Sequence, residues 1–168
     1  MRNCDLKSKM GLCAAALGLL PGCLKVNADE TGGAQATARV KNPAIAVQPS
    51  TLANTLSGSF DLTVSVDKSS TEDAVFSDPP SFDLISAQGG SAITPLDAVP
   101  DQDPFPLTLA PGKSTTLSFT LSNRNTVSSE ELAKLCSGPV VIVAVLTDSS
   151  GGNPTTAESS ATSATGCF

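Results

Sequence analysis

The chain has 168 residues, the length of one domain of ordinary size, and 40% of them are hydrophobic. Aromatic residues make up only 4% and charged residues 15%, a composition that argues against coiled coils and long charged helices. Histidine is absent, which excludes a Ser-His-Asp or Cys-His nucleophile system and every metal site that needs imidazole. The formal charge of −6 opposes nucleic-acid binding, because such binding depends on clustered Lys and Arg.

The N-terminal segment has the pattern of a cleaved export signal. Arg2, Lys7 and Lys9 precede an uninterrupted run of apolar and small residues over 10–20, as in the charged and hydrophobic regions of a signal peptide. At a helical rise of about 1.5 Å per residue this run reaches roughly 16 Å, which is about half the hydrocarbon thickness of a bilayer. We therefore expect residues 1–22 to be a signal peptide rather than a transmembrane span.

The residues directly after this run resemble the lipobox of bacterial lipoproteins. Leu20 lies three positions before Cys23, and the small residue Gly22 lies immediately before it. The resemblance implies that Cys23 is lipidated and that acyl chains hold the protein on a membrane. Leu24 follows the cysteine, and a residue other than Asp there implies the outer membrane in envelopes that sort lipoproteins. The alternative is an ordinary secretory signal with a chance cysteine.

Two cysteines remain after the expected processing. Of the five in the chain, two lie in the signal peptide and one in the lipobox, which leaves Cys136 and Cys167. In an oxidising compartment such a pair is expected to form a disulfide. The two positions are symmetric about Gly151-Gly152, the predicted turn of a C-terminal hairpin, so the cysteines are expected to face each other across it. The alternative is two free thiols.

The rest of the chain shows the period-two pattern of half-buried strands. Residues 59–66 alternate Phe, Leu and Val with Asp, Thr and Ser, and residues 114–121 repeat this alternation. Pro43 and Pro49 place the first expected strand at the edge of a sheet. The expected strands are 39–47, 59–66, 82–87, 92–96, 105–109, 114–121, 139–147 and 155–165.

Two further local signals bear on the topology. Ser128 followed by Glu131 three residues later has the form of a capping box, which predicts a short helix before the penultimate strand. A two-residue hairpin at Pro111-Gly112 would set apolar against polar side chains on one face. This turn is therefore expected to be a bulged turn or a crossing between two sheets.

The order of strands and turns over residues 57–147 resembles immunoglobulin-like modules of bacterial secreted proteins and lipoproteins. The resemblance rests on the alternating first strand, on 82–84 followed by Gly89-Gly90, on 109–114 leading into 117–119, and on the final aliphatic strand. It implies an all-β fold, an immunoglobulin-like antiparallel β-sandwich with one short helix. The core Trp and inter-sheet disulfide of antibody domains are missing.

These observations divide the chain into three parts. They are the lipoprotein signal peptide (1–22), the lipidated cysteine with a flexible tether (23–38) and the β-sandwich domain (39–168). The motif Ser-Phe-Asp-Leu occurs at 59–62 and again at 81–84. No constant further period follows, so two strands of similar composition are expected rather than an internal repeat.

No catalytic, cofactor-binding or metal-binding residue is assigned. Residues 61–103 hold nine acids and one base, but they lack the spacing of an EF-hand loop, so a solvated acidic surface is expected rather than a calcium site. Lys68, Lys113 and Lys134 could suggest a Ser-Lys nucleophile. A lysine base needs burial to lower its pKa, and these three lie in polar segments.

Two functional classes remain. The first is a non-catalytic, lipid-anchored protein of the bacterial cell envelope that presents its sandwich for binding or structural interaction at the membrane surface. Its partner would be an envelope protein or a glycan and not a nucleic acid. The alternative is an inhibitor or regulator of an exported enzyme such as a protease, because some of the modules that the chain resembles are proteinase inhibitors. The fold alone does not choose between them.

Overall fold

The computed structural model describes residues 34–122, 124–151 and 153–167. The predicted signal peptide and Cys23 lie outside these residues. The described elements are β1 (Ala36–Gln48), β2 (Asn54–Val66), β3 (Ala74–Phe76), β4 (Ser81–Ser86), β5 (Ala92–Leu96), β6 (Ala98–Pro100), β7 (Leu107–Leu109), β8 (Ser114–Leu121), β9 (Thr126–Val127), α1 (Ser129–Cys136), β10 (Val140–Leu146) and β11 (Thr155–Glu158).

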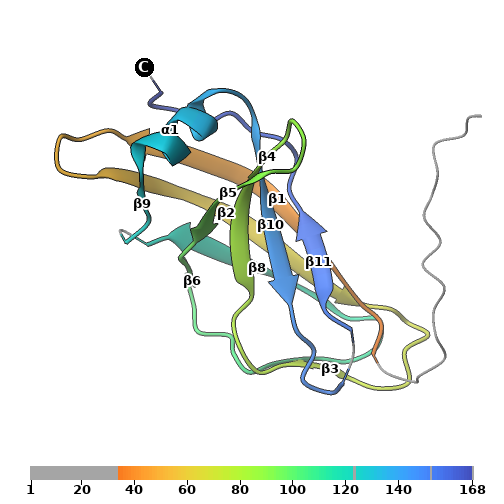
Figure 1. Cartoon of the computed structure of the whole chain (residues 1–168). Helices are drawn as coiled ribbons and strands as arrows, with labels where there is room; N and C mark the ends of the chain where they lie inside the picture. Colours follow the sequence, from red (N-terminus) through yellow and green to blue (C-terminus); the bar gives the residue numbers. More distant parts are fainter. Residues whose placement is uncertain (1–33, 123, 152, 168) are drawn as a thin grey trace, which may run out of the picture. The chain divides into compact units, whose positions relative to one another are not determined.

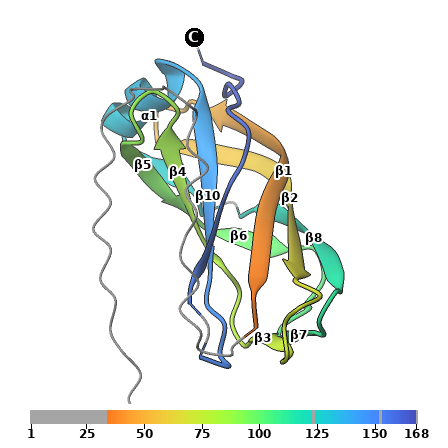
Figure 2. The same ribbon diagram turned by 90° about the vertical axis from the view of Figure 1, so that its right-hand side faces the viewer.

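The strands form two antiparallel sheets that face each other. Sheet I has the order β1-β2-β8-β6, with β9 paired to β2, and sheet II has the order β11-β10-β4-β5 (Figure 1). In Figure 2, β4, β5 and β10 form the left-hand layer, and β1, β2 and β8 form the right-hand layer. The short strands β3 and β7 pair separately. An all-β antiparallel sandwich with one short helix before the penultimate strand is therefore confirmed.

Three phenylalanines join the two sheets at the centre of the core. Phe60 and Phe119 come from sheet I and stack with their ring centroids 5.5 Å apart. Phe82 comes from sheet II and meets each of them edge to face at 4.9 Å. All three side chains are buried, and ring contacts of this geometry add about 0.5–1.5 kcal/mol per pair to the burial of apolar area. The apolar residues of the alternating strands are thus buried in one core that both sheets share.

β1 is the outermost strand of sheet I, as its prolines predict. Its ladder with β2 shifts register between Lys41 and Ala44, where Pro43 has no amide hydrogen to donate. The strand begins at Ala36, which pairs with Val66. The first strand of the sandwich thus starts three residues before the expected domain boundary at residue 39.

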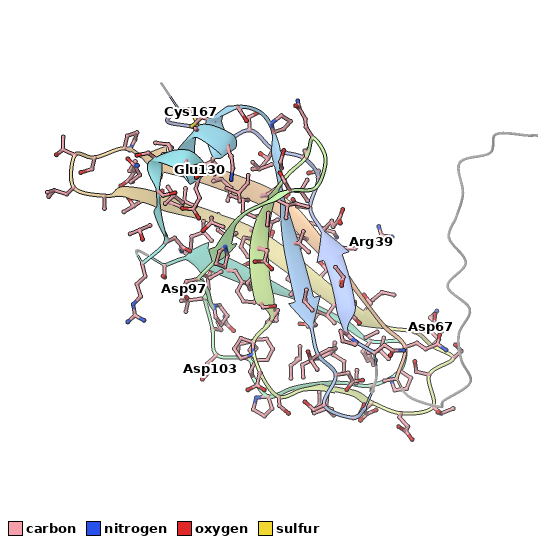
Figure 3. All side chains as sticks on the ribbon, viewed as in Figure 1. Arg39, Asp67, Asp97, Asp103, Glu130 and Cys167 are labelled. Carbon is pink, nitrogen blue, oxygen red and sulfur yellow. A yellow bond between two sulfur atoms is a disulfide. The ribbon has the colours of Figure 1, made fainter. Side chains whose placement is uncertain are left out.

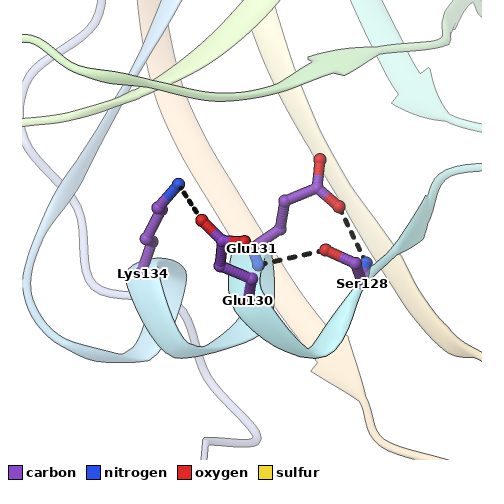
Figure 4. A network of polar contacts seen from close by, with 4 residues as sticks. All are labelled: Ser128, Glu130, Glu131 and Lys134. Atoms are coloured by element: carbon purple, nitrogen blue, oxygen red, sulfur yellow. Dashed lines mark hydrogen bonds and ion pairs between the residues drawn. The ribbon is translucent and has the colours of Figure 1, made fainter.

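The predicted helix is present with its capping box (Figure 4). The Glu131 backbone N–H donates to Ser128 Oγ at 3.2 Å, and the Ser128 backbone N–H donates to the Glu131 carboxylate at 2.7 Å. The second of these bonds holds the pKa of Glu131 below its ordinary value, because it stabilises the ionised carboxylate. Lys134 forms an ion pair with Glu130, one turn earlier in the helix, at 2.8 Å.

The Pro111-Gly112 turn crosses between sheets, which is one of the two forms predicted for it. The strand before it, β7, pairs with β3, whereas β8 after it belongs to sheet I. The Lys113 N–H donates to the Ala110 carbonyl at 3.0 Å, which closes the turn. Gly112 adopts a φ of +74°, and a glycine at this position of a type II turn accepts that angle without strain.

The predicted register of the C-terminal hairpin is wrong by two residues, because Leu146 pairs with Thr155 and not with Ala157. This pairing of β10 with β11 centres the hairpin one position before Gly151-Gly152. The reason lies at Asp148, whose carboxylate accepts the Ser150 N–H at 2.9 Å and the Val75 N–H of β3 at 3.2 Å. This local turn fixes the start of the return strand.

The last strand is also shorter than the predicted range 155–165. β11 ends at Glu158 because the Ser159 hydroxyl accepts the Ile142 N–H at 3.0 Å, in place of a further backbone carbonyl. Residues 159–167 form what we call the C-terminal strap. Thr162 bonds to Val140 in sheet II, and Thr165 bonds to Ile45 and Val47 in sheet I. The strap therefore closes one side of the sandwich.

Cys136 and Cys167 form the predicted disulfide. Its place in the fold differs from the expectation, because Cys136 is the last residue of α1 and not part of a strand. The bond thus joins the helix to the end of the strap instead of joining neighbouring strands. The two cysteines still meet although they do not pair across the hairpin, because β11 ends at Glu158 and the strap then carries Cys167 to the helix.

Candidate binding site

The carboxylates of the acidic segment 61–103 are spread over several elements and bonded locally. Asp67 accepts the Ser69 hydroxyl at 2.6 Å and the Ser69 N–H at 2.7 Å, and these two bonds lower its pKa. Asp97 accepts the Ser122 hydroxyl at 2.7 Å. Within residues 34–167, wherever the structure describes them, no three acidic or cysteine side chains gather closely enough to hold a metal ion.

The outer face of sheet I carries rows of hydroxyl groups. Residues that pair directly across neighbouring strands share a face of the sheet, and on this face almost every partner is Ser or Thr. Thr63 lies opposite Thr116, and their hydroxyls are hydrogen-bonded at 3.0 Å. The residues of this hydroxyl face are Thr37, Ser59, Thr63, Ser65, Ser114, Thr116, Ser118 and Thr120.

Asp61 is an acidic residue within this hydroxyl face, and its charge is held in place by neighbours. Its carboxylate accepts the Asn42 amide at 2.8 Å and the Ser118 hydroxyl at 2.7 Å. These two hydrogen bonds keep the pKa of Asp61 below its ordinary value, because both favour the ionised form. Lys41 lies opposite Asp61 in the ladder and lowers the pKa further through its charge.

Four basic residues border the hydroxyl face. Arg39 and Lys41 lie on β1 opposite Thr63 and Asp61, whereas Lys68 and Lys113 lie at the end of the sheet, in the turns next to β2 and β8. We call these four residues the basic strip. In Figure 3, Arg39 and Asp67 lie on the right of the molecule, away from Asp97 and Asp103 on the left.

The basic strip concentrates cations on an acidic protein. Six of the ten basic residues lie in the described part of the chain, and the strip contains four of them. In that same part the ion pair found is Lys134 with Glu130. The four cations of the strip are therefore not neutralised by a described carboxylate at ion-pairing distance.

An open cleft of about 430 Å³ lies at the end of the hydroxyl face. Lys68 and Lys113 line it together with the hydroxyls of Thr37, Ser65 and Ser114, and Asp67 is its acidic residue. Gly112 forms part of the wall. A Cβ atom at this position would lie 3.1 Å from Lys68 Cγ, so the glycine leaves room for the lysine stem.

Both edges of sheet I and the β5 edge of sheet II are poorly suited to binding by strand addition. The strap hydrogen-bonds to β1 at Ile45 and Val47, β5 contains Pro95, and β6 is three residues long and ends at Pro100. Prolines and short strands oppose edge pairing because few N–H groups are left to donate. A ligand of sheet I therefore meets side chains on a face, in a cleft or on a loop.

Two lysines of this site also stand out in the sequence, but as candidate partners of a serine nucleophile. Lys68 and Lys113 were considered as nucleophile partners, and the structure brings both into the cleft. Arg39 and Lys41 were not singled out. The sequence feature that could have identified them is the alternation of residues 37, 39 and 41 along a predicted edge strand. This alternation places Thr37, Arg39 and Lys41 on the same face of the sheet.

No protein-family model, curated protein or solved structure matches the chain. Across the residues that the structure describes, no helix has the length and apolar character needed to cross a membrane. The predicted lipidation residue Cys23 lies outside those residues, so the lipid anchor stays a prediction from the lipobox.

Proposed function

We propose that this protein is a non-catalytic lipoprotein of the bacterial cell envelope that binds a ligand through the outer face of its sandwich. The observation that carries the proposal is that the basic strip borders the hydroxyl face: Arg39 and Lys41 lie along its β1 side, and Lys68 and Lys113 line the cleft at its end. Lys41 faces Asp61 and Lys68 lies next to Asp67, but neither lysine forms an ion pair with these carboxylates among the described residues, and neighbouring cations that are not fully neutralised repel each other. An acidic protein that keeps four of them together on one face is suited to binding an anion there.

The anchor completes the proposal. The lipobox resemblance assigns lipidation to Cys23, and Leu24 favours the outer membrane. β1 begins at Ala36, so even a fully extended connection from Cys23 would be only about 45 Å long. A lipid chain at Cys23 would thus hold the binding face close to the membrane surface, within reach of the layers next to it.

Replacing Cys23 tests the anchor. We expect Cys23→Ala to leave an unlipidated precursor, or a product that no longer partitions into the detergent phase with membranes. Cys13→Ala, inside the predicted signal, is the matched control and should leave partitioning unchanged. Equal membrane attachment of wild type and Cys23→Ala would show that the protein is not lipidated at this residue.

A second candidate function, inhibition or regulation of an exported protease, is favoured by the loop between β1 and β2. Leu52 at its tip is 95% exposed. Asn54 organises the loop, because its side chain accepts the Ser50 N–H at 3.3 Å and donates to the Val127 carbonyl at 3.5 Å. An exposed aliphatic side chain on an organised loop can enter an apolar pocket of a protein partner.

Capture from crosslinked envelopes separates the two candidates. Recovery of a protease whose activity falls when the pure protein is added would favour inhibition, and Leu52→Asp should then abolish the effect. Val99→Asp, at the second exposed large apolar residue, is the matched control for inhibition alone, because Val99 pairs with Thr120 and so lies on the outer face of sheet I. Recovery of envelope glycan, with no effect of Leu52→Asp, would favour binding through the outer face of sheet I.

A further inference from the structure

We infer that the ligand of the hydroxyl face and basic strip is an acidic polysaccharide, a polymer that carries hydroxyl groups together with carboxylate or phosphate groups. The inference rests on the proposed function and names the chemical class of its ligand. It follows from the two kinds of side chain that share this face: hydroxyls in the middle, and cations along one strand and at one end.

The hydroxyl face matches the neutral part of such a polymer. Each Ser or Thr hydroxyl is both a donor and an acceptor, as is each sugar hydroxyl. The rows lie on paired strands about 4.8 Å apart, and residues two apart along a strand repeat about every 6.7 Å. The face therefore offers a regular array of hydrogen-bonding groups instead of one deep pocket, which suits an extended polymer.

The basic strip matches the charged part and sets the direction of the polymer. Arg39 and Lys41 follow each other along β1 on one face, and Thr37, the next outward residue, already lines the cleft with Lys68 and Lys113. A chain lying along β1 would thus pass the two β1 cations and end in the cleft. The cleft, at about 430 Å³, lies within the size range of small-ligand sites.

Two other anionic partners fit this surface less well. Nucleic acid demands many phosphate contacts, and a protein of net charge −6 with four clustered cations provides few. A flat anionic bilayer would meet Asp67 at the end of the sheet together with the two lysines of the cleft. A single polymer chain that follows the strip passes Arg39 and Lys41 first and meets Asp67 only where it ends in the cleft.

Lysine acetylation footprinting on the full-length protein in neutral phosphatidylcholine vesicles tests the inference. Polygalacturonate is the acidic probe and dextran the neutral control. We expect polygalacturonate to protect Lys41, Lys68 and Lys113 from acetylation, to leave Lys134 unprotected, and to lose this effect as salt rises. Dextran should protect them weakly or not at all.

Substitutions then identify the residues responsible. The double variant Arg39→Gln/Lys41→Gln should weaken polygalacturonate binding roughly tenfold, since two exposed charge contacts are removed. Arg124→Gln/Lys134→Gln makes the same change of charge elsewhere and should leave the affinity within about twofold. All four side chains are exposed, so circular dichroism should show both variants folded.

The outcomes separate this inference from the proposed function. Absence of protection by polygalacturonate, or equal affinity of the two double variants, overturns the acidic-polysaccharide ligand. Protection of the strip lysines by phosphatidylglycerol vesicles without polymer, and not by polygalacturonate, replaces it with membrane contact. In each case retention of the lipid anchor leaves the envelope lipoprotein intact, whereas membrane attachment that does not depend on Cys23 removes the proposed function itself.

Discussion

The same tetrapeptide, Ser-Phe-Asp-Leu, lies in both sheets, in β2 at 59–62 and in β4 at 81–84. In each copy the phenylalanine points inward, and the rings of Phe60 and Phe82 meet in the core. Asp61 and Asp83 therefore point to opposite outer faces of the sandwich. Identical local sequence thus gives identical orientation but places the two carboxylates in different surroundings.

The neighbouring strands decide what those surroundings are. Asp61 lies beside the Ser118 hydroxyl of β8, a strand that alternates hydroxyl and apolar residues. Asp83 pairs with Val143 of β10 and Pro95 of β5, and β10 is aliphatic at every position, including those that face outward. The outer face of sheet I therefore carries polar binding chemistry, whereas the outer face of sheet II has an aliphatic strand, β10, between polar residues of β4 and β11.

The largest effect on stability should come from replacing the buried phenylalanine in each copy of the Ser-Phe-Asp-Leu tetrapeptide. Phe60→Ala and Phe82→Ala should each lower the free energy of unfolding by about 3–5 kcal/mol, because each opens a cavity in the shared cluster. The double variant should cost less than the sum, since the two rings are in contact. Urea denaturation measures all three. Strict additivity would mean that the copies do not share one core.

Removal of the disulfide that holds the strap should have the next largest effect on the free energy of unfolding, because the strap connects sheet I, which holds one copy of the tetrapeptide, to sheet II, which holds the other. Cys136→Ser/Cys167→Ser removes a bond that closes a loop with a sequence separation of 31 residues, and should cost about 2–4 kcal/mol. Few large apolar residues hold the strap otherwise, so its end should open first.

Hydrogen exchange locates that opening. The Val47 amide donates to the Thr165 carbonyl and should lose protection in the double cysteine variant. The Leu62 amide lies in the centre of sheet I and is the internal control. Equal loss of protection at both amides would show that the disulfide supports the whole sandwich rather than the strap.

Long alternating segments are where sequence and structure agree. The strands around 59–66 and 114–121, the edge position of β1 and the capping box at Ser128 all appear as predicted. Each depends on interactions within a few residues or on a repeated pattern. The strands β3, β6 and β9 were missed because two or three residues carry no readable period.

Features that depend on distant partners were the least predictable. The hairpin register depends on a hydrogen bond from Val75 to Asp148, 73 positions apart. The early end of β11 depends on a single serine side chain. The cleft joins β1 to turns near residues 68 and 112, which the chain brings together only when sheet I is complete. The basic strip could therefore be assembled only from the structure.

Two opposite substitutions, valine to threonine on the outer face of sheet II and threonine to valine on that of sheet I, should have moderate effects on stability. Val143→Thr should cost about 1 kcal/mol, because it places a hydroxyl among the aliphatic residues of β10. Thr63→Val should change stability by no more than about 0.5 kcal/mol, since both residues favour strands and the face is solvated. Thermal unfolding of the two variants measures the difference. Equal losses would remove the distinction between the two faces.

The smallest effect concerns Asp61 and depends on pH. The Asn42 and Ser118 side chains lower its pKa in the folded protein below the ordinary value of 3.8, so the ionised carboxylate stabilises the fold. That stabilisation is complete above the unfolded pKa and is lost as the pH falls through the folded pKa. Asp61→Asn should therefore cost about 0.5 kcal/mol near pH 7, a size typical of exposed charged contacts, and almost nothing at about pH 2.

Ser118→Ala supplies the matched test of this mechanism. It removes one of the two donors to Asp61, so in its background Asp61→Asn should show a smaller difference between neutral and acidic pH. Thermal unfolding of the four proteins at both pH values gives the coupling between the two residues. If Asp61→Asn destabilised the protein equally at both pH values, its effect would come from the replacement of an acceptor oxygen by an amide donor, and the charge on the hydroxyl face would play no part in holding β1, β2 and β8 together.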